Sequence, residues 1–413
     1  MANKTDCIIL GGGAAGLAAC AALSARGVHV TLAERLDRVG KKIMASGNGR
    51  CNLSNADMNA AYYAEAAPFV SSVYQQTPPQ EVLSFFSSLG LMTSQEDGRI
   101  YPRTMMASSV LDVLRAGCAR QNATILTGAQ AVSLSPSRRG GWSVQLASGE
   151  GLFAPIVLCA MGGSASPHLG TDGSSAALLG ALGHTVTPLY PALVQLRCEH
   201  GALKSLKGIR VQAALSLMID GQTAAQETGE LLFADYGVSG VCVFQLSRYA
   251  AKALGKKKKV ALQINLLPEI APGQTLAWLQ RRAGCMPECE ALSLFTGVFP
   301  RLLTQAIVKE AGVSADTPVR SLSAQSLSAL ASAISALSLP VIGTQGFKNA
   351  QVTAGGISLD EVDPCTMASR LFDGLYIAGE ALDADGPCGG YNLHFAFAGA
   401  LTAAKAIASR LGV

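Results

Sequence analysis

The sequence predicts an α/β fold that begins with a dinucleotide-binding unit and carries an inserted module in its middle. An apolar run at residues 7–10 leads into the pattern Gly-x-Gly-x-x-Gly at residues 11–16. A second apolar run, residues 28–33, ends at Glu34. The pattern changes character over residues 192–338, and a strand, turn and helix return afterwards. Strand, glycine turn, helix, strand and acid in this order are typical of a nucleotide-binding βαβ unit.

Each glycine of the turn has a physical task. Gly11 lets the chain turn tightly after the first strand, Gly13 lets the backbone approach a pyrophosphate, and Gly16 lets the next helix pack closely on the strand. A helix that starts near Ala14 points its N-terminal amides at the phosphates. Glu34 stands where a carboxylate accepts the ribose hydroxyls and repels a 2′-phosphate.

Composition and charge limit the classes of protein that fit. With 413 residues, 49% of them hydrophobic, the chain can bury a large core in two or three domains. Its net charge of +4 is too small to indicate a nucleic-acid partner, and the lysine run at residues 256–259 is expected to be a solvated loop. No apolar window reaches the roughly eighteen residues of a membrane span, and no leader pattern precedes the first strand. A cytoplasmic protein without a membrane partner is expected.

The cysteines do not indicate a metal or dithiol site. Eleven cysteines are scattered without a Cys-x-x-Cys pair, and the nearest two, Cys285 and Cys289, have no clustered histidines beside them. Reduced and mostly buried thiols are expected, with no bound metal.

Apolar spacing predicts further elements along the chain. Helices are expected at residues 80–89, 107–121, 275–283, 301–311 and 321–336. Strands are expected at residues 124–127, 131–134, 142–146, 156–160 and 211–219. The Ser/Ala/Leu-rich segment at 321–338 resembles a linker in composition, but its repeating apolar positions favour an amphipathic helix.

The end of the chain returns to the chemistry of its start. Residues 374–380 form a short apolar strand that ends in Glu380, and a glycine-rich turn at 386–390 precedes a helical pattern at 392–410. A carboxylate such as Glu380 can bind a ribityl hydroxyl, and a helix N-terminus near Asn392 can stabilise negative charge on a reduced flavin. A simple nicotinamide dehydrogenase needs neither, so this return favours a flavoprotein.

Five unusual segments resemble one family nearly from end to end. They are residues 40–55, 229–233, 236–240, 352–356 and 389–393. The chain resembles the bacterial HI0933-like flavoproteins, a family that includes proteins described as aminoacetone oxidases and as reductases of unsaturated 3-oxo bile acids.

This resemblance implies a glutathione-reductase-like Rossmann FAD domain built from both chain ends, at residues 1–191 and 339–413. Residues 192–338 are then an inserted substrate-side module, with a β-barrel-like part and a small helical domain over about 270–338.

The resemblance also implies a non-covalent FAD site. Its expected residues are Gly11, Gly13, Ala14, Ala15, Gly16, Glu34, Arg35, Lys41, Lys42, Ser46, Gly47, Asn48, Gly49, Arg50, Cys51, Asn52, Ala131, Met161, Gly162, Gly379, Glu380, Asp383, Gly390, Tyr391, Asn392 and Leu393. The chemistry of residues 41–52 fits independently, because two lysines and an arginine supply charge while glycines and asparagines allow close backbone approach.

Fewer residues are candidates for proton transfer to the substrate than for binding FAD. They are Arg50, Tyr236, Tyr391 and His394, with Tyr101 and Arg103 as further possibilities that equally fit a loop anchor. A tyrosine or histidine can protonate a substrate atom as hydride leaves flavin N5. His394 stands in an apolar helical sequence, which fits a core imidazole as well as a catalyst.

Three functions remain open. The favoured one is an FAD-dependent reductase of an activated C=C bond in a small, steroid-like enone, with NAD(P)H as the transient electron donor. The alternative is a flavin amine oxidase that takes hydride from an aminoacetone-like substrate and passes electrons to oxygen. A nucleic-acid-associated flavoprotein is disfavoured by the small net charge of +4. A second Gly-x-Gly-x-x-Gly unit is missing, so either the nicotinamide visits the open flavin face or another donor supplies the electrons. The oligomeric state stays open.

Overall fold

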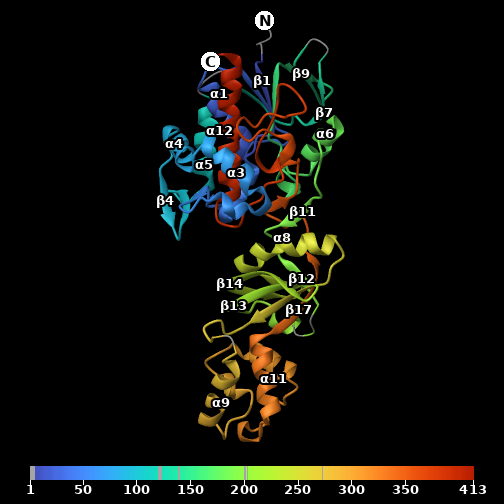
Figure 1. Cartoon of the computed structure of the whole chain (residues 1–413). Coiled ribbons are helices and arrows are strands. Elements are labelled where there is room, and N and C mark those ends of the chain that lie inside the picture. The colour runs from blue at the N-terminus through green and yellow to red at the C-terminus, as the bar shows by residue number, and fades with distance from the viewer. Residues whose placement is uncertain (1–4, 120–122, 138–139, 200, 202, 272) are drawn as a thin grey trace. The chain divides into compact units, whose positions relative to one another are not determined.

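The structure is a computed structural model that describes residues 5–119, 123–137, 140–199, 201, 203–271 and 273–413. It divides into two compact units (Figure 1). The first unit combines the chain up to Tyr190 with Val352–Val413, and the second is Pro191–Gln351. The expected boundary after residue 338 differs from this division, because it cuts strand β17 (Leu337–Thr344), which belongs to the second unit.

The first unit is built on a five-stranded parallel sheet in the order β19-β10-β1-β2-β6. The strands are β1 (Cys7–Leu10), β2 (Val30–Ala33), β6 (Ala123–Leu126), β10 (Ile156–Cys159) and β19 (Leu375–Ile377). Every residue of β1, β2, β10 and β19 is buried, as expected for a parallel sheet covered on both faces. Because β19 pairs with β10, both ends of the chain contribute to one sheet, which is a Rossmann-like arrangement.

Three helices stack beside this sheet: α1 (Ala14–Ser24), α5 (Ala107–Ala119) and α12 (Tyr391–Leu411). Helix α1 contacts both of the others. Its sequence is mostly alanine and leucine, and residues 15–24 are all buried, so small side chains let three helices approach closely. The remaining helical segments of this unit are α2 (Lys41–Ala45), η1 (Ser46–Gly49), η2 (Ala60–Ala66), α3 (Ala67–Gln76), α4 (Pro79–Ser88), η3 (Pro167–Leu169), α6 (Ser174–Leu182), η6 (Leu359–Glu361) and η7 (Gly379–Ala381).

Two antiparallel three-stranded sheets complete the first unit. One contains β7 (Ala131–Pro136), β8 (Trp142–Leu146) and β9 (Gly151–Ala154). The other contains β3 (Ser54–Asn55), β5 (Arg99–Pro102) and β4 (Thr93–Glu96). Separately, β11 (Tyr190–Ala192) pairs with β18 (Val352–Ala354) in a two-stranded sheet.

The second unit contains a closed antiparallel barrel in the order β12-β15-β14-β13-β16-β17. Its strands besides β17 are β12 (Leu196–Cys198), β13 (Arg210–Ile219), β14 (Gln222–Ala234), β15 (Gly237–Ser239) and β16 (Val260–Asn265). Helix α8 (Val241–Gly255) packs on the barrel strands. The other helical segments are α7 (Leu203–Leu206), α9 (Thr275–Cys285), η4 (Ser293–Phe295), α10 (Arg301–Glu310), η5 (Val319–Ser321) and α11 (Ala324–Ser335), with α9 and α11 side by side (Figure 1).

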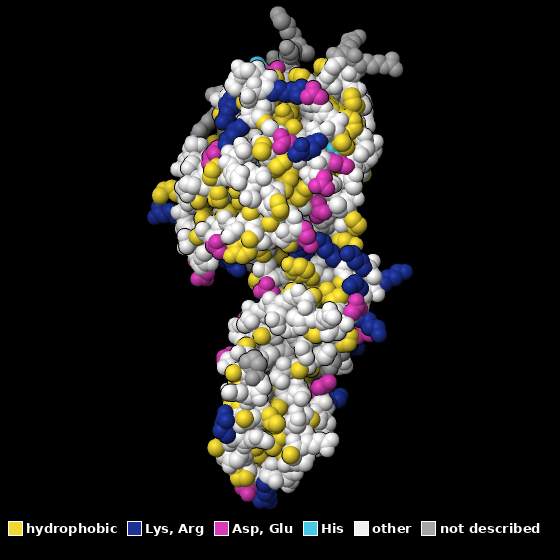
Figure 2. All heavy atoms as spheres, viewed as in Figure 1, with side chains coloured by type: hydrophobic (Ala, Val, Ile, Leu, Met, Phe, Trp, Pro, Cys, Tyr) yellow, Lys and Arg dark blue, Asp and Glu magenta, His cyan; other side chains and the backbone are white. Residues whose placement is uncertain are grey.

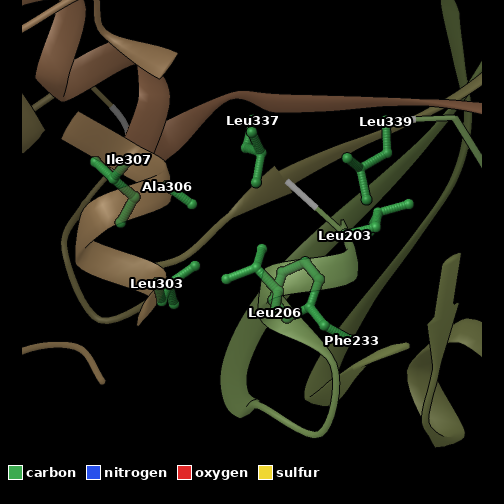
Figure 3. Close-up of a pocket in the computed structure, with 8 residues that line it drawn as sticks. All are labelled: Leu203, Leu206, Phe233, Leu303, Ala306, Ile307, Leu337 and Leu339. Atoms are coloured by element: carbon green, nitrogen blue, oxygen red, sulfur yellow. The ribbon is translucent and has the colours of Figure 1, made fainter. Parts of the chain in front are cut away.

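Each unit has its own hydrophobic core. In the second unit a small pocket lies where α7, α10 and the barrel meet, and its eight lining side chains are all apolar (Figure 3). They are Leu203, Leu206, Phe233, Leu303, Ala306, Ile307, Leu337 and Leu339. With no polar lining group to orient a substrate, this pocket is part of the packing between the helices and the barrel.

The helices and strands expected from apolar spacing each overlap an observed element, and most bounds agree within two residues. The helix expected at 321–336 starts three residues too early, because α11 begins at Ala324. The expected helix at 107–121 corresponds to α5, and its last two residues lie outside the described part of the chain. The hairpin of β4 and β5 and the helices η2 and α3 were not predicted. Strand β4 has the polar sequence Thr-Ser-Gln-Glu and is largely exposed, so it carries no apolar alternation.

Candidate active site

The glycine turn after β1 has the geometry of a phosphate cradle. Gly11 has φ +101°, and a Cβ there would lie 2.5 Å from the carbonyl oxygen of Ala160. A Cβ on Gly16 would lie 1.8 Å from the carbonyl oxygen of Gly11. A Cβ on Gly13 would meet no atom within 4 Å. Helix α1 starts at this open position without a side-chain cap, so its first amides are available to an anion.

Glu34 is fixed at the end of β2 beside this turn. Its side chain is buried, Oε2 accepts a hydrogen bond from the Gly12 amide at 2.7 Å, and Oε1 accepts one from the Leu36 amide at 2.8 Å. Each carboxylate oxygen has a further lone pair. The geometry therefore suits acceptance of two ribose hydroxyls. The neighbouring Arg35 forms an ion pair with Asp172.

The two lysines of α2 have different partners. Lys41 Nζ lies 2.6 Å from Oδ1 of Asp37, whose side chain is 76% exposed. Lys42 Nζ instead lies 2.6 Å from Oε2 of Glu380, which follows strand β19 near the end of the chain. Both side chains of this second pair are mostly buried. Only the Lys42 pair joins segments that are far apart in the sequence.

Glu380 is the centre of a network that ties four segments together. Its Oε1 accepts a hydrogen bond from the Thr353 amide at 3.0 Å. The Oγ1 atom of Thr353 accepts from the amides of Ser164 and Ala165 at 2.8 and 3.0 Å. A Cβ on Gly163 would lie 2.4 Å from that Oγ1, so the loop after β10 needs glycine there. This loop contains the expected site residues Met161 and Gly162.

Thr353 was not among the residues expected in the site. It is a polar side chain that is 2% exposed in the all-buried strand β18. Its place within the family-like segment 352–356 could have indicated a role in the site. Ala131 is the first residue of β7 and pairs with Leu146. Asp383 follows η7, and its amide donates to the Ile357 carbonyl at 3.1 Å.

The segment after α2 follows an unusual backbone path. Gly47, Asn48, Gly49 and Cys51 all have positive φ, between 55° and 83°. Asn48 and Cys51 adopt this conformation at a cost, which is common where a backbone is shaped around a ligand. The Cys51 side chain is fully buried, and burial raises the pKa of its thiol to about 11. A thiol in this state is a poor nucleophile at neutral pH.

This segment brings Asn52 to the start of α12. The Oδ1 atom of Asn52 is buried and has no hydrogen-bond partner among the described residues. A Cβ on Gly390 would lie 2.8 Å from that atom and 2.4 Å from the Ser54 carbonyl oxygen. Gly390 precedes α12 with φ +100° and no side-chain cap. A buried acceptor and open helix amides therefore lie together, which suits a ligand with both a donor and an anionic edge.

The side chain of Asn392 shapes the turn at residues 386–390. Its Oδ1 accepts a hydrogen bond from the Gly386 amide at 2.8 Å, while Nδ2 donates to the carbonyl oxygens of Gly386 and Pro387 at 2.9 and 3.2 Å. The expected contribution of this residue was its place at the helix N-terminus. The structure adds that its side chain holds the turn closed.

Two of the proton-transfer candidates have partners in the first unit. The guanidinium of Arg50 lies 4.7 Å from the ring centroid of Tyr101, and its NH1 is 2.9 Å from Oε2 of Glu96. The hydroxyl of Tyr391 donates to the Asp57 carbonyl at 3.1 Å. Burial, with the nearby Tyr62, raises the pKa of Tyr391 to about 12, so this phenol keeps its proton at neutral pH.

The other two candidates are placed differently. Tyr236 lies between β14 and β15 in the second unit, and its contact with a flavin stays a prediction. His394 is fully buried in the first turns of α12, and burial lowers its pKa to about 3. The imidazole is neutral at physiological pH, so it carries no extra proton to donate.

Among the described residues, no group of three or more His, Cys, Asp or Glu side chains is placed to hold a metal ion. In the same part of the chain, no helix has both the length and the apolar character that crossing a bilayer requires. All eleven cysteines are free thiols. On the visible face of the first unit, basic and acidic side chains are interspersed (Figure 2).

The sequence matches the family described as HI0933-like protein Rossmann domain over residues 5–406. The chain belongs to this family. It is 39% identical, over 97% of its length and 98% of the other protein, to a "3-dehydro-bile acid delta(4,6)-reductase" of Clostridium scindens. It is 26% identical, over 98% of both chains, to a "Ribosomal RNA dihydrouridine synthase" of Escherichia coli.

Solved structures support the same fold. A 3-ketosteroid-delta4-(5alpha)-dehydrogenase from Rhodococcus jostii RHA1 has a TM-score of 0.50 at 13% identity, covering 98% of this chain and 97% of that one. A quinol fumarate reductase from Escherichia coli has a TM-score of 0.50 at 15% identity, covering 99% and 71%. At these identities the likeness concerns the fold alone. The family and the 39% identical reductase identify the chain as a flavin oxidoreductase.

Proposed function

We propose that this protein reduces a C=C bond conjugated to a carbonyl in a steroid-like enone, with NAD(P)H as the electron donor. The observation that carries the proposal is the 39% identity, along nearly the whole chain, to a protein named as a bile-acid delta(4,6)-reductase. The second relative, named as a dihydrouridine synthase, also points to addition of hydrogen to a ring double bond. The names of both relatives therefore indicate saturation of a double bond, on two different substrates.

The residues present fit FAD. We place its pyrophosphate at the open position beside Gly13, where the amides of α1 point outward, and its adenosine ribose at Glu34. Residues 46–52 and the start of α12 would hold the flavin ring, where the buried Asn52 Oδ1 has no partner among the residues that the structure describes. Lys42 holds Glu380 in place beside this position.

FAD bound there would supply a hydride, from its reduced form, to a carbon of the enone. The N-terminus of α12, which has no side-chain cap, would stabilise negative charge on the reduced flavin through its first amides and the helix dipole. Tyr391, at the first position of that helix, holds a proton on its Oη at neutral pH. Arg50, held between Glu96 and the Tyr101 ring, is the cation available to polarise a substrate carbonyl.

Anaerobic stopped-flow mixing tests the proposal. The FAD-loaded protein is mixed with NADH or NADPH while the visible flavin band is followed, and the reduced protein is then mixed with a 3-oxo-Δ4,6 steroid acid. Bleaching by a nicotinamide, followed by recovery of the band with loss of the dienone absorbance, is the expected result. Bleaching by aminoacetone, with recovery only on admission of oxygen, would contradict the proposal and favour an amine oxidase.

Ribosomal RNA is tested as a second substrate, because one relative is named as a ribosomal RNA dihydrouridine synthase. The same reduced protein is mixed with a uridine-containing ribosomal RNA fragment. We expect no recovery of the flavin band with RNA at concentrations where the steroid gives full recovery. Recovery with RNA alone would reassign the substrate while keeping the bond-saturating chemistry.

A further inference from the structure

His394 is a buried imidazole that the proposed reaction does not use. It is 0% exposed, and its Nδ1 lies 2.8 Å from Oγ of Ser54. Its ring and the Tyr74 ring form a T-shaped pair, with centroids 5.5 Å apart and planes at 85°. Its Nε2 has no hydrogen-bond partner among the described residues. Burying a ring nitrogen without a hydrogen bond costs free energy, and the bond of Nδ1 to Ser54 offsets the burial of Nδ1 alone.

The Ser54 hydrogen bond connects two segments of the flavin site. Ser54 is 1% exposed and lies in β3, two residues after Asn52. Its carbonyl oxygen and the Asn52 Oδ1 both face Gly390, since a Cβ on that glycine would lie 2.4 and 2.8 Å from them. His394 belongs to the helix that Gly390 starts, and the His394 amide donates to the Gly390 carbonyl at 3.0 Å. This side-chain bond and the hydrogen bond from Asn55 Nδ2 to the Gly389 carbonyl oxygen, at 2.9 Å, together fix the strand that follows Asn52 against the start of α12.

We propose that His394 is a positioning residue: through Ser54 it fixes the Asn52 side chain at the start of α12, where Asn52 Oδ1 accepts a hydrogen bond from the ring N–H of the flavin. This inference rests on the flavin placement proposed above. The pyrimidine edge of the flavin offers one N–H donor beside two carbonyl acceptors. Within the described part of the chain, Asn52 Oδ1 is a buried acceptor without a donor, and open α12 amides lie beside it to serve the carbonyls.

Titration of apoprotein with FAD is the main test, followed by the visible spectrum and the midpoint potential of the bound flavin. Asn52→Ala is expected to weaken FAD binding about tenfold, as for loss of one buried hydrogen bond. Ser54→Ala and His394→Phe are each expected to weaken it severalfold and to shift the spectrum. The Ser54→Ala/His394→Phe double variant should bind FAD no more weakly than whichever single variant binds it less tightly, because both changes remove the same hydrogen bond.

His394→Asn is the conservative variant, since the asparagine amide can occupy the position of Nδ1 and bond to Ser54. We expect it to restore FAD affinity and spectrum while leaving the shape of the pH profile of turnover unchanged. A His394→Asn protein with normal FAD binding that has lost one limb of the pH profile would overturn the inference in favour of proton transfer. Ser54→Ala with unchanged affinity, spectrum and potential would also overturn it, even if His394→Phe fails to fold.

Glu34→Ala separates this inference from the flavin placement. Glu34 contacts neither Ser54 nor His394, and it belongs to the proposed ribose end of the site. If Glu34→Ala weakens FAD binding while Asn52, Ser54 and His394 variants do not, the positioning role fails and the placement stands. If Glu34→Ala also leaves FAD affinity unchanged, the placement itself fails.

Discussion

Lys42 Nζ and Glu380 Oε2 lie 2.6 Å apart although 338 residues separate them in the chain. The other carboxylate oxygen of Glu380 accepts from the Thr353 amide, so the lysine fixes a group that organises the loop after β10 as well. This pair joins helix α2 to the segment after β19, and both segments belong to the proposed FAD site.

Lys42→Met should loosen this site. The substitution leaves the Glu380 carboxylate without its cation while keeping the apolar stem of the side chain. We expect a loss of about 1–2 kcal/mol from the stability of the apoprotein, smaller than for a fully buried pair because both side chains keep some contact with water. Thermal unfolding and FAD titration measure the two effects.

Lys41→Met is the matched control. Lys41 pairs with an Asp37 side chain that is 76% exposed, a surface pair of the i, i+4 kind. Its removal should change stability by less than about 0.5 kcal/mol. Equal losses from the two variants would show that the Glu380 contact contributes nothing specific.

Gly13→Ala and Gly16→Ala should separate cofactor binding from folding. A methyl group on Gly13 enters open space and the backbone there is extended, so the apoprotein should melt as the wild type does. The added methyl group would occupy the space assigned to the pyrophosphate, so FAD affinity should fall roughly tenfold or more.

A methyl group on Gly16 would lie 1.8 Å from the Gly11 carbonyl oxygen, so that variant should lose about 3 kcal/mol or more of stability. An alanine at 13 that binds FAD normally would move the pyrophosphate elsewhere.

Asn392→Ala should disturb the turn at residues 386–390 and the flavin next to it. The change removes three hydrogen bonds to Gly386 and Pro387, which should cost about 1–3 kcal/mol of stability. Because the turn aims the first amides of α12, the midpoint potential of bound FAD should fall as well. Redox titration against a reference dye measures it.

Asn59→Ala serves as the comparison for Asn392→Ala. Asn59 also accepts from a backbone amide, that of Ala61 at 2.9 Å, but at an exposed position. Its loss should leave the flavin potential unchanged. A potential that is the same in Asn392→Ala and wild type would mean that the turn does not stabilise the reduced flavin.

Stability should fall on acidification because of His394. Burial lowers its pKa to about 3 in the folded protein, against an ordinary value of 6.5. Between these values the unfolded chain binds a proton that the native protein does not, so stability decreases as pH falls through this window. Between pH 7 and pH 5 the loss is about 2 kcal/mol, and His394→Asn should remove it.

The buried Trp142 can report this change by fluorescence, because it belongs to the first unit, with the second-unit Trp278 replaced by Phe. Urea unfolding at the two pH values gives the difference in stability. The exposed His168 is the control, and His168→Asn should keep the full acid sensitivity. If the two histidine variants behave alike, the buried ring is not the source of the effect.

Local patterns were enough to predict the glycine turn after the first strand, because each part of it depends on neighbours in sequence. Gly11, Gly16 and Glu34 interact within one βαβ unit, and their spacing is fixed by one helix and one strand. Strand β8 was expected at the same residues for a similar reason, since its buried and exposed positions alternate strictly.

Contacts between distant segments could not be predicted in this way. The pairing of β12 with β17 joins Leu196 to Thr344, and no local property of either strand specifies the other. The same holds for the partner of Lys42 and for the Ser54 bond of His394. The end of the inserted module was also placed too early, because residues 337–344 look like the end of a helical region rather than a strand that closes a barrel.

The position of β19 and α12 has a consequence for how the protein is made. Ribosomes release the N-terminal strands and α1 first, yet α1 is covered by a helix that begins at Tyr391. Until those last residues leave the exit tunnel, the alanine-rich face of α1 has no partner and the sheet lacks its edge strand. The proposed flavin site, which includes the start of α12, is therefore complete only after the whole barrel has been synthesised.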